Sequence, residues 1–350
     1  MTAPLDRRVP VIVLGGFLGS GKTTLLKRLL ERGDGPRTAV IINEFGEISL
    51  DHLLVSNVEG NSVVLKNGCV CCVIRTDLQS ALRDLLDAKA VAGGRQFDRI
   101  VIETTGLADP GPIAQTLGTD PMLRRQTRLA GIVCTVDAMN GAHQIGAHEE
   151  CLQQIAIADR IALTKTDLIE EDAVGSLTGM IAGINVRAGI FDLQGQMATG
   201  DDVEALFETD GTSEAAISWI RCAPALTARH ANIENVLFET LQPVDWTAFA
   251  VWLSAFVHHY ADDVLRIKGL LTVPGAAGPI VLDVVRNHIH PPRHLSDWPD
   301  DSRASRIVFI VRNIEVRALK LSLLDFLGHA PEIKQEFIPP ALERAHPQTA

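Results

Sequence analysis

The chain has 350 residues, of which 46% are apolar and 21% are charged, so it is long enough for two domains with packed cores and its composition is not that of a disordered protein. Its formal net charge of −11 argues against sequence-independent binding to nucleic acid and against binding to an anionic membrane. No segment reaches the roughly 18 apolar residues of a membrane span, and the first apolar run leads into a glycine loop rather than a signal-peptide cleavage site. We therefore expect a cytoplasmic protein whose six cysteines do not form a disulfide framework.

The first 195 residues, predicted to be the first domain, alternate apolar runs with helical stretches. Strands are predicted at Val9–Leu14, Thr38–Ile42, Ser62–Leu65, Arg99–Glu103, Gly131–Val136, Arg160–Thr164 and Ala188–Phe191. Helices are predicted at Lys22–Arg32, Asp77–Ala90, Glu149–Ala158 and Glu170–Ile181. Several of the strand runs are continuously apolar, as in strands that are covered on both faces. The alternation predicts a doubly wound, mainly parallel sheet that binds its ligand at the carboxyl ends of its strands.

The remaining chain is predicted to contain a linker, a second domain and a tail. Residues 196–213 are polar and are predicted to be the linker, with a short helical patch at Val203–Phe207. Residues 214–340 are predicted to form a smaller α+β domain, and residues 341–350 a flexible tail. In this domain Asp245 precedes a helix with an aromatic and aliphatic stripe, which we interpret as core. The other predicted elements are Leu265–Val273, Ile280–Arg286, Arg306–Val311 and the helix Glu315–Leu327.

A phosphate-binding loop is predicted between the first strand and the first helix. Gly16 to Thr23 reads Gly-Phe-Leu-Gly-Ser-Gly-Lys-Thr and fits the P-loop pattern G-x-x-x-x-G-K-[ST]. Glycines let successive backbone N–H groups turn toward an anion, and the helix start adds further donors. Lys22 is expected to reach the β- and γ-phosphates, and the Thr23 hydroxyl to bind Mg²⁺. The nucleotide-binding residues predicted here are Gly16, Gly19, Ser20, Gly21, Lys22, Thr23 and Thr24. The alternative is a glycine-rich turn with a solvated lysine.

An acidic residue, Glu103, is predicted at the end of a strand and is followed by Thr104-Thr105-Gly106. P-loop proteins place such a carboxylate where it reaches Mg²⁺ directly or through water. Gly106 can offer its N–H to the γ-phosphate, so that the loop after the strand senses hydrolysis. We therefore assign Lys22, Thr23 and Glu103 to catalysis, with Thr23 and Glu103 at the magnesium ion.

The segment Thr164-Lys165-Thr166-Asp167 follows another apolar strand, at the place where many GTPases have Asn-Lys-x-Asp. A carboxylate accepts hydrogen bonds from N1 and N2 of guanine, an arrangement that adenine lacks, so Asp167 is expected to select GTP and GDP. The Lys165 stem can lie along the base. Thr164 replaces the usual asparagine and removes one side-chain amide. A solvated strand end is the alternative interpretation.

Three of the six cysteines, Cys69, Cys71 and Cys72, lie within four residues of one another, directly after Gly68. In a reducing compartment such a cluster indicates metal or redox chemistry. Three thiolates suit Zn²⁺ first, with Cu⁺, Co²⁺ and Ni²⁺ behind it. The alternative is a set of small buried hydrophobic residues. The isolated cysteines are expected to be structural: Cys134, Cys151 and Cys222.

The cysteine cluster lies between the P-loop and Glu103, and Asn43-Glu44-Phe45-Gly46-Glu47 occupies the place of a first switch loop. A metal-binding loop between two switches can be tightened or loosened by the γ-phosphate. This is our hypothesis for how nucleotide and metal are coupled. Farther along the chain, His288, His290 and His294 have two interpretations, a second metal site or surface polar residues near a turn, and we favour the second.

Together these motifs resemble the CobW-type GTPases, a family that belongs with the hydrogenase and urease nickel-insertion GTPases. The likeness rests in the first domain on Gly15 to Thr24, Asn43 to Glu47, Asn67 to Cys72, Glu103 to Pro110, Val133 to Ala138 and Thr164 to Asp167. In the second domain it rests on Leu265 to Gly269 and Ser305 to Ile310. The resemblance spans nearly the whole chain, and Thr164 matches the Thr-Lys-Thr-Asp subgroup of bacterial members.

The resemblance implies an α/β P-loop GTPase domain followed by a smaller α+β CobW C-terminal-like domain, and a GTP-dependent metallochaperone that serves a client metalloprotein. The metal is zinc in most members and cobalt or nickel in some, and some relatives form homodimers. The metal ligands implied are Cys69, Cys71 and Cys72, with Glu47 as a further ligand. Ile42 stands where some similar proteins have an acidic residue, so a two-glutamate version of that site cannot form here.

Two alternatives to this function remain open. One is a GTPase activator of a specific metalloenzyme, of the cobalamin-pathway or nitrile hydratase type, and the other is a metal or redox sensor with a structural nucleotide. A P-loop kinase is disfavoured by Lys165 and Asp167. We expect slow intrinsic hydrolysis, because no water-positioning glutamine or arginine finger can be assigned from the sequence.

Overall fold

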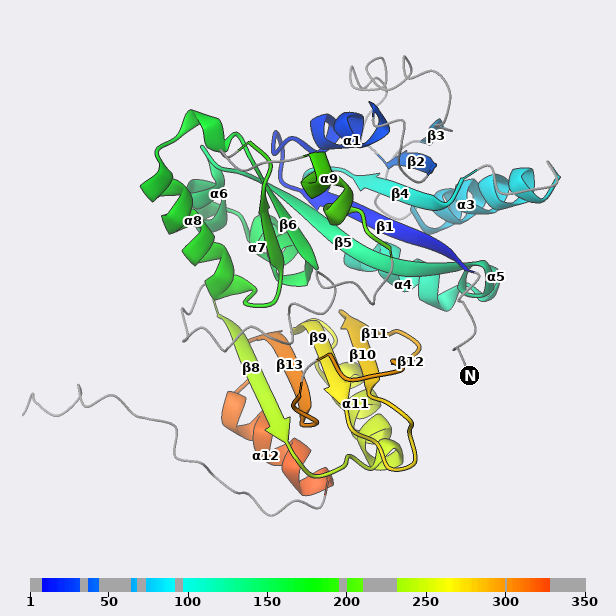
Figure 1. Ribbon diagram of the computed structural model, residues 1–350, viewed down its shortest axis with the longest axis vertical. Coiled ribbons are helices and arrows are strands. Elements are labelled where there is room, and N and C mark those ends of the chain that lie inside the picture. Colours follow the sequence, from blue (N-terminus) through cyan, green and yellow to red (C-terminus); the bar gives the residue numbers. More distant parts are fainter. Residues whose placement is uncertain are drawn as a thin grey trace, which may run out of the picture.

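The computed structural model describes residues 8–31, 37–43, 64–67, 74–91, 97–194, 200–209, 232–299 and 301–327. Several predicted residues lie outside this part of the chain: Glu47, Cys69, Cys71, Cys72, Cys222 and the tail at 341–350. The described residues form two sheets with helices packed around them (Figure 1).

The first sheet is parallel throughout and has the strand order β3-β2-β4-β1-β5-β6-β7. Its strands are β1 Val9–Gly16, β2 Thr38–Asn43, β3 Val64–Asn67, β4 Arg99–Thr104, β5 Thr127–Asp137, β6 Arg160–Thr164 and β7 Gly189–Asp192. Strands β1, β4 and β6 are buried along their whole length, because helices cover both faces of the sheet. The prediction of a doubly wound parallel sheet is confirmed.

Alternate residues of β1 enter two different cores, as the period of a strand requires: Val11 and Val13 pack on one face, Ile12 and Leu14 on the other. Helices α1 (Lys22–Glu31) and α9 (Gly200–Leu206) cover the face of Ile12. The opposite face is covered by α3 Ile74–Val91, α4 Gly111–Thr119, α5 Pro121–Gln126, α6 Gly141–Ala147, α7 Glu149–Ile157 and α8 Glu171–Ile184. A single 3₁₀ turn, Thr166–Leu168, follows β6.

The segment predicted as a linker contains α9, which packs on the first sheet. Phe207, just after this helix, is fully buried with the residues of α1. Arg99 of β4 pairs with Glu204 at 2.6 Å and donates to the carbonyl of Phe207 at 2.9 Å. Residues 200–209 therefore pack as part of the first domain, and the predicted boundary at residue 214 lies outside the described residues.

The second sheet is antiparallel, with the strand order β11-β10-β9-β13-β8, and β12 pairs with β10. Its elements are β8 Ile233–Thr240, α11 Trp246–His259, β9 Val264–Leu271, β10 Ile280–Val285, β11 His288–Ile289, β12 Arg293–His294, β13 Ser305–Arg312 and α12 Val316–Phe326. Asp245 caps α11 by accepting from two backbone N–H groups. Trp252 and Phe256 of this helix lie edge-on to Phe309 of β13, so the aromatic stripe forms core as expected.

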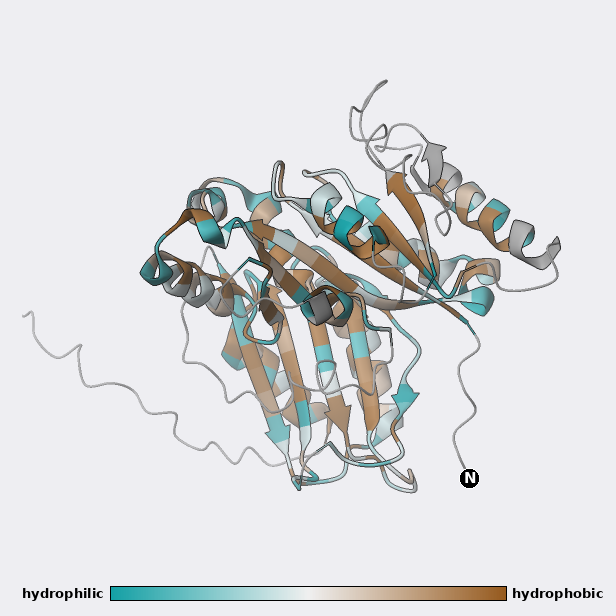
Figure 2. Ribbon diagram, turned by 45° about the horizontal axis from the view of Figure 1, so that its top comes forward, coloured by the Kyte–Doolittle hydropathy of each residue, from teal (hydrophilic) through white to brown (hydrophobic). Residues whose placement is uncertain are grey.

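The second sheet is covered on both faces. Helices α11 and α12 pack on one face, and the first domain packs on the other, where Leu265, Val308 and Ile310 join the core around α7. In Figure 2, where the ribbon is coloured by hydropathy, most residues of the strands in both sheets are brown, that is, hydrophobic. Among the described residues, no helix combines the length and apolar composition needed to cross a membrane.

Candidate nucleotide-binding site

The glycines of the predicted phosphate loop adopt backbone conformations that other residues rarely reach. The φ angles of Gly16, Gly19 and Gly21 are 137°, 71° and 93°. A Cβ on Gly16 would also lie 2.2 Å from the hydroxyl oxygen of Thr135. The loop therefore needs glycine both for its conformation and for its close approach to β5.

Lys22 and Thr23 begin α1 and reach toward different parts of the site. The Lys22 ammonium group lies across the loop and donates to the carbonyls of Gly16 at 2.8 Å and Phe17 at 3.1 Å. The Thr23 hydroxyl donates to the Glu103 carboxylate at 2.8 Å. The two predicted magnesium-binding residues are thus in contact, and their oxygen atoms are the donor type that Mg²⁺ prefers.

A chain of hydroxyl groups connects the phosphate loop to the strands beside it. The hydroxyl oxygens of Ser20 and Thr135 are 2.6 Å apart, and both residues are buried. Thr164, at the end of β6, donates its hydroxyl to the Ser20 carbonyl at 2.8 Å. Thr164 thereby joins the predicted base-binding segment to the P-loop, although it lacks the amide of the usual asparagine.

The segment after β6 is held by the P-loop and by the end of β5. Lys165 has a φ of 59°, and its ammonium group contacts the Gly19 carbonyl at 3.0 Å and Asp137 at 2.7 Å. Burial alone would raise the pKa of Asp137, but hydrogen bonds from Lys165 and Asn140 hold the pKa below its usual value. The Asp137 carboxylate is therefore a fixed negative partner for Lys165.

The predicted guanine-binding residue, Asp167, lies in the 3₁₀ turn and is exposed. Gln194 accepts a hydrogen bond from the Lys165 backbone N–H at 2.6 Å, and Asp192 accepts from the Thr166 hydroxyl at 2.5 Å. Sequence reasoning assigned no role to Gln194 or Asp192. Their position in the sequence could have indicated a role, because they lie at and just after the end of a parallel strand, where ligands bind in such sheets.

The loop after β4 contacts both the P-loop and α7. A Cβ on Gly106 would lie 2.7 Å from the backbone nitrogen of Leu18, so the two loops touch at backbone distance. Gln154, which is buried in α7, donates to the carbonyls of Gly106 at 3.1 Å and Ala108 at 2.9 Å. Gln154 was not predicted. The sequence feature that could have indicated its role is a polar side chain on an otherwise apolar helix face.

The predicted transition-metal ligands lie outside the described residues. Within the ranges that the structure describes, no three His, Cys, Asp or Glu side chains converge as a metal site would require. His288 and His290 pack edge to face with ring centres 4.7 Å apart, whereas His294 is exposed on β12. Cys134 and Cys151 are buried, and burial raises the pKa of both thiols, that of Cys151 to about 12. Both are structural, as expected.

The order of strand, glycine loop and helix, with the acidic end of β4 against the loop threonine, is that of a P-loop GTPase. Two family models match this chain. The one described as "CobW/HypB/UreG, nucleotide-binding domain" covers residues 10–192, and "Cobalamin synthesis protein cobW C-terminal domain" covers residues 233–327. The chain therefore belongs to the CobW/HypB/UreG family of GTPases.

Similar proteins extend the match over most of the chain. The zinc chaperone YjiA of Escherichia coli (strain K12) is 36% identical over 305 residues, which cover 86% of this chain and 93% of that protein. The zinc chaperone CobW of Pseudomonas aeruginosa is 28% identical over 354 residues, covering 89% and 90%. A crystal structure of a Zn(II)-bound triple mutant of YjiA GTPase has a TM-score of 0.71 at 30% identity, covering 91% of this chain and 99% of that one.

Proposed function

We propose that this chain is a GTP-hydrolysing zinc chaperone that binds the metal through Cys69, Cys71 and Cys72 and transfers it to a client metalloprotein in step with its nucleotide state. The proposal includes Glu47 as a further ligand and a reducing, cytoplasmic setting. Zinc is favoured over cobalt and nickel because thiolates suit it, and because the similar E. coli protein is a zinc chaperone.

The observation that carries this proposal is the register of the strand ends. Asn43 of β2 pairs with Thr104 of β4 on one side and with Asn67 of β3 on the other. Cys69 follows Asn67 by two residues in the sequence, a stretch of chain that spans at most about 7 Å. Strand β3 therefore ends at the same edge of the sheet as Glu103 and the loop of Gly106, and the short spacing from Asn67 to Cys69 supports coupling between thiolates and phosphate.

We propose the following division of work at the nucleotide. Lys22 binds the β- and γ-phosphates, Thr23 and Glu103 hold Mg²⁺, and Asp167 binds guanine. Bound Mg²⁺ would neutralise charge on the phosphates. The Gly106 N–H senses the γ-phosphate, and its contact with Leu18 passes movement of that loop to the P-loop.

The coupling is tested by titrating the full chain with zinc, once with GDP and once with a non-hydrolysable GTP analogue. We expect the two dissociation constants to differ by roughly 5- to 150-fold, and zinc to shift nucleotide affinity by the same factor. Replacing Cys69, Cys71 and Cys72 with serine should abolish the difference. Cys222→Ser, the same chemical change outside the cluster, is the control. Equal zinc affinity in both nucleotide states would overturn the proposal.

Two variants separate the GTPase from its alternatives. Lys22→Ala should abolish multiple-turnover phosphate release, and absence of release from the unmodified chain with metal present would favour a sensor with structural nucleotide. Asp167→Asn should shift preference from GTP toward xanthosine triphosphate. Asp172→Asn, an exposed carboxylate at the start of α8, should leave the preference unchanged. If Asp167→Asn also left it unchanged, Asp167 would have no role at the base.

A further inference from the structure

The second domain contacts the loop that follows β4, close to the nucleotide site. Strands β10 and β11 are joined by the two-residue turn Arg286-Asn287. The Arg286 side chain extends from this turn to the first domain, where its Nε and Nη2 atoms lie 3.1 and 2.8 Å from one carboxylate oxygen of Asp109. Asp109 belongs to the same loop as Gly106. The second domain therefore holds a loop of the first domain through an ion pair.

This ion pair is largely shielded from water, which makes it stronger than a pair at the open surface. The Arg286 side chain is 13% exposed and that of Asp109 is 30% exposed. The second carboxylate oxygen of Asp109 accepts from the Gly111 N–H at 2.8 Å, where α4 begins. A Cβ on Gly111 would lie 2.7 Å from the Cγ atom of Arg286, so glycine leaves room for the arginine stem. One oxygen of Asp109 thus fixes the loop locally, and the other binds the second domain.

The backbone of Arg286 has a conformation that is unusual for arginine. Its φ angle is 55°, in the left-handed region that glycine, asparagine and aspartate adopt most readily in such turns. Residues held in this way cluster at functional sites, because their conformational cost must be offset by other interactions. A turn that only reversed the chain would not need a long cationic side chain. The contact with Asp109 gives a reason for arginine at this position.

Helix α7 connects the Arg286 contact with the phosphate loop. The side-chain oxygen of Gln153 accepts a hydrogen bond from Arg286 at 2.8 Å. At the start of the same helix, His148 stacks on Phe17 of the P-loop, with ring centres 4.6 Å apart. The guanidinium group of Arg286 therefore binds both the loop after β4 and the helix that packs against the P-loop.

The next residue of α7, Gln154, gives the loop a reason to adopt a second arrangement. Its amide group donates to the carbonyls of Gly106 and Ala108, whereas its Oε1 atom is buried and has no hydrogen-bond partner among the residues that the structure describes. A buried acceptor without a donor is costly, so a movement that brings a backbone N–H to this oxygen is favoured. The pull of Arg286 on Asp109 acts on the same loop and therefore on the choice between arrangements.

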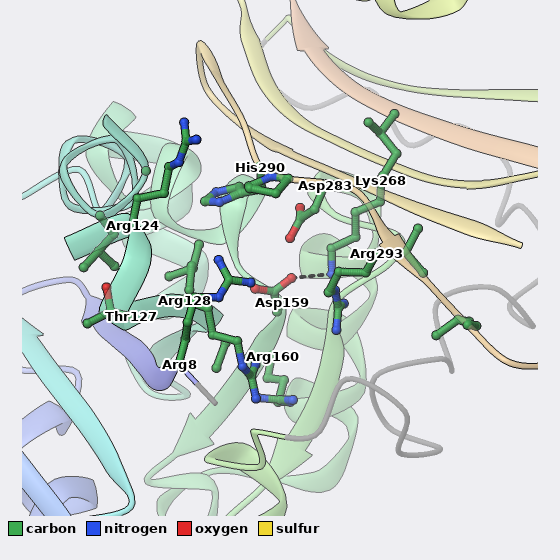
Figure 3. A pocket seen from close by; sticks show the side chains of 18 of the residues that line it. Arg8, Arg124, Thr127, Arg128, Asp159, Arg160, Lys268, Asp283, His290 and Arg293 are labelled. Atoms are coloured by element: carbon green, nitrogen blue, oxygen red, sulfur yellow. Dashed lines mark ion pairs between the residues drawn. The ribbon is translucent and has the colours of Figure 1, made fainter. Parts of the chain in front are cut away.

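A second group of ion pairs between the domains lies at the opposite end of the first sheet. There, at the wall of a small cavity, Asp159 pairs with Lys268 of β9 (Figure 3). Arg266 of the same strand also pairs with Asp159, at 2.7 Å. Asp159 directly precedes β6, whereas the nucleotide loops follow the carboxyl ends of the parallel strands. These pairs join the domains at a distance from both nucleotide loops, so they offer a control for the contact of Arg286.

We propose that Arg286 is a positioning residue for GTP hydrolysis: through Asp109 it places the Gly106 loop, so that the second domain controls the preference of the site for GTP over GDP. The inference rests on the proposed role of Gly106 at the γ-phosphate. Arg286 acts through this loop and not on the nucleotide itself. Because coupling is reciprocal, GTP binding changes the strength of the contact between Arg286 and Asp109, and the nucleotide state thereby reaches the second domain.

The test measures GTP hydrolysis at saturating GTP and Mg²⁺, together with the affinities for GDP and for a non-hydrolysable GTP analogue, all in the full chain without zinc. Arg286→Gln should lower the hydrolysis rate and the analogue affinity about tenfold each. GDP affinity should change less than about twofold, because GDP has no γ-phosphate to reach the loop. Lys268→Gln is the matched control, since it also removes one positive charge from an ion pair between the domains. It should leave the rate and both affinities unchanged.

A double-mutant cycle tests whether Arg286 acts through Asp109. Asp109→Asn should slow hydrolysis as much as Arg286→Gln does, and the double variant should be no slower than either. Arg286→Lys keeps the charge but not the paired N–H groups, so its rate should fall between those of Arg286→Gln and the unmodified chain. Additive losses in the double variant would overturn the proposal. Denaturant unfolding of each variant checks that it is folded.

Other outcomes separate this inference from the proposed function. Normal hydrolysis in Arg286→Gln would exclude a positioning role and leave the proposed function intact. Equal loss of GDP and analogue affinity, or an equal effect in Lys268→Gln, would also exclude it, because general damage to the structure does not distinguish the two nucleotides. If Gly106→Ala left hydrolysis unchanged while Arg286→Gln slowed it, the proposed γ-phosphate contact would be wrong, and Arg286 would act through another residue of the loop.

Discussion

Replacing Thr164 with valine tests whether the base-binding segment positions the P-loop. Valine keeps the shape of threonine, including the methyl group next to Gly21. It removes only the hydroxyl, which donates to the Ser20 carbonyl at 2.8 Å and lies 3.3 Å from the Val136 carbonyl. Ser20 is fully buried and Thr164 is 5% exposed, so water cannot replace this bond freely. The loss should lower the free energy of unfolding by about 1–2 kcal/mol, or roughly 5- to 30-fold in the equilibrium constant.

The informative measurement is the affinity for GDP, followed by fluorescence of a labelled nucleotide, beside denaturant unfolding of the nucleotide-free chain. If the hydroxyl positions the loop, Thr164→Val weakens GDP binding several-fold, whereas Thr164→Ser does not. Thr178→Val is the control, because its hydroxyl also donates to a backbone carbonyl, at 2.9 Å, but within α8 and away from the site. Normal GDP affinity in Thr164→Val, with stability reduced as in Thr178→Val, would refute the reasoning.

Three further predictions concern the loop after β4, the packing of α9 and the joint between the domains. Gly106→Ala places a Cβ 2.7 Å from the Leu18 nitrogen, so the loop after β4 and the P-loop must separate. Phosphate release, measured by stopped flow, should then slow more than about tenfold. An unchanged rate would contradict a role for the contact between these two loops. Phe207→Ala should lower the unfolding free energy by about 3–5 kcal/mol in urea titrations, and a loss below about 1 kcal/mol would mean that α9 does not contribute to the core. Asp159 is buried, but Arg266 and Lys268 hold the pKa of its carboxyl group well below the unfolded value of 3.8. The charged carboxylate therefore stabilises the folded state above pH 3.8, and this stabilisation is lost as the pH falls through the folded pKa. The free energy of unfolding of Asp159→Asn at pH 7 should therefore be lower by about 3–5 kcal/mol, and it should depend less on pH in the acid range. If the variant and the unmodified chain lost stability in parallel as the pH fell, this carboxylate would not be a source of acid sensitivity.

The first sheet could be predicted from the sequence because its strands are buried on both faces and read as continuous apolar runs. The second-domain strand β8, Ile233–Thr240, was not predicted, since its apolar residues are interrupted by Glu234 and Asn235. Its burial depends on packing against α8, where Asn235 donates to the carbonyls of Gly183 and Ile184 at 3.1 Å. Such partners are distant in sequence and leave no local periodicity.

In the nucleotide site too, residues in local sequence patterns could be predicted and residues that act through distant contacts could not. The P-loop and the acid at the end of β4 are local patterns, so Lys22, Thr23 and Glu103 could be selected, and the structure brings Thr23 and Glu103 into contact. Gln154 and Asp137 act through contacts across the fold. A polar residue in an apolar helix or at a strand end signals a buried partner, but its identity becomes known only when the chain is folded.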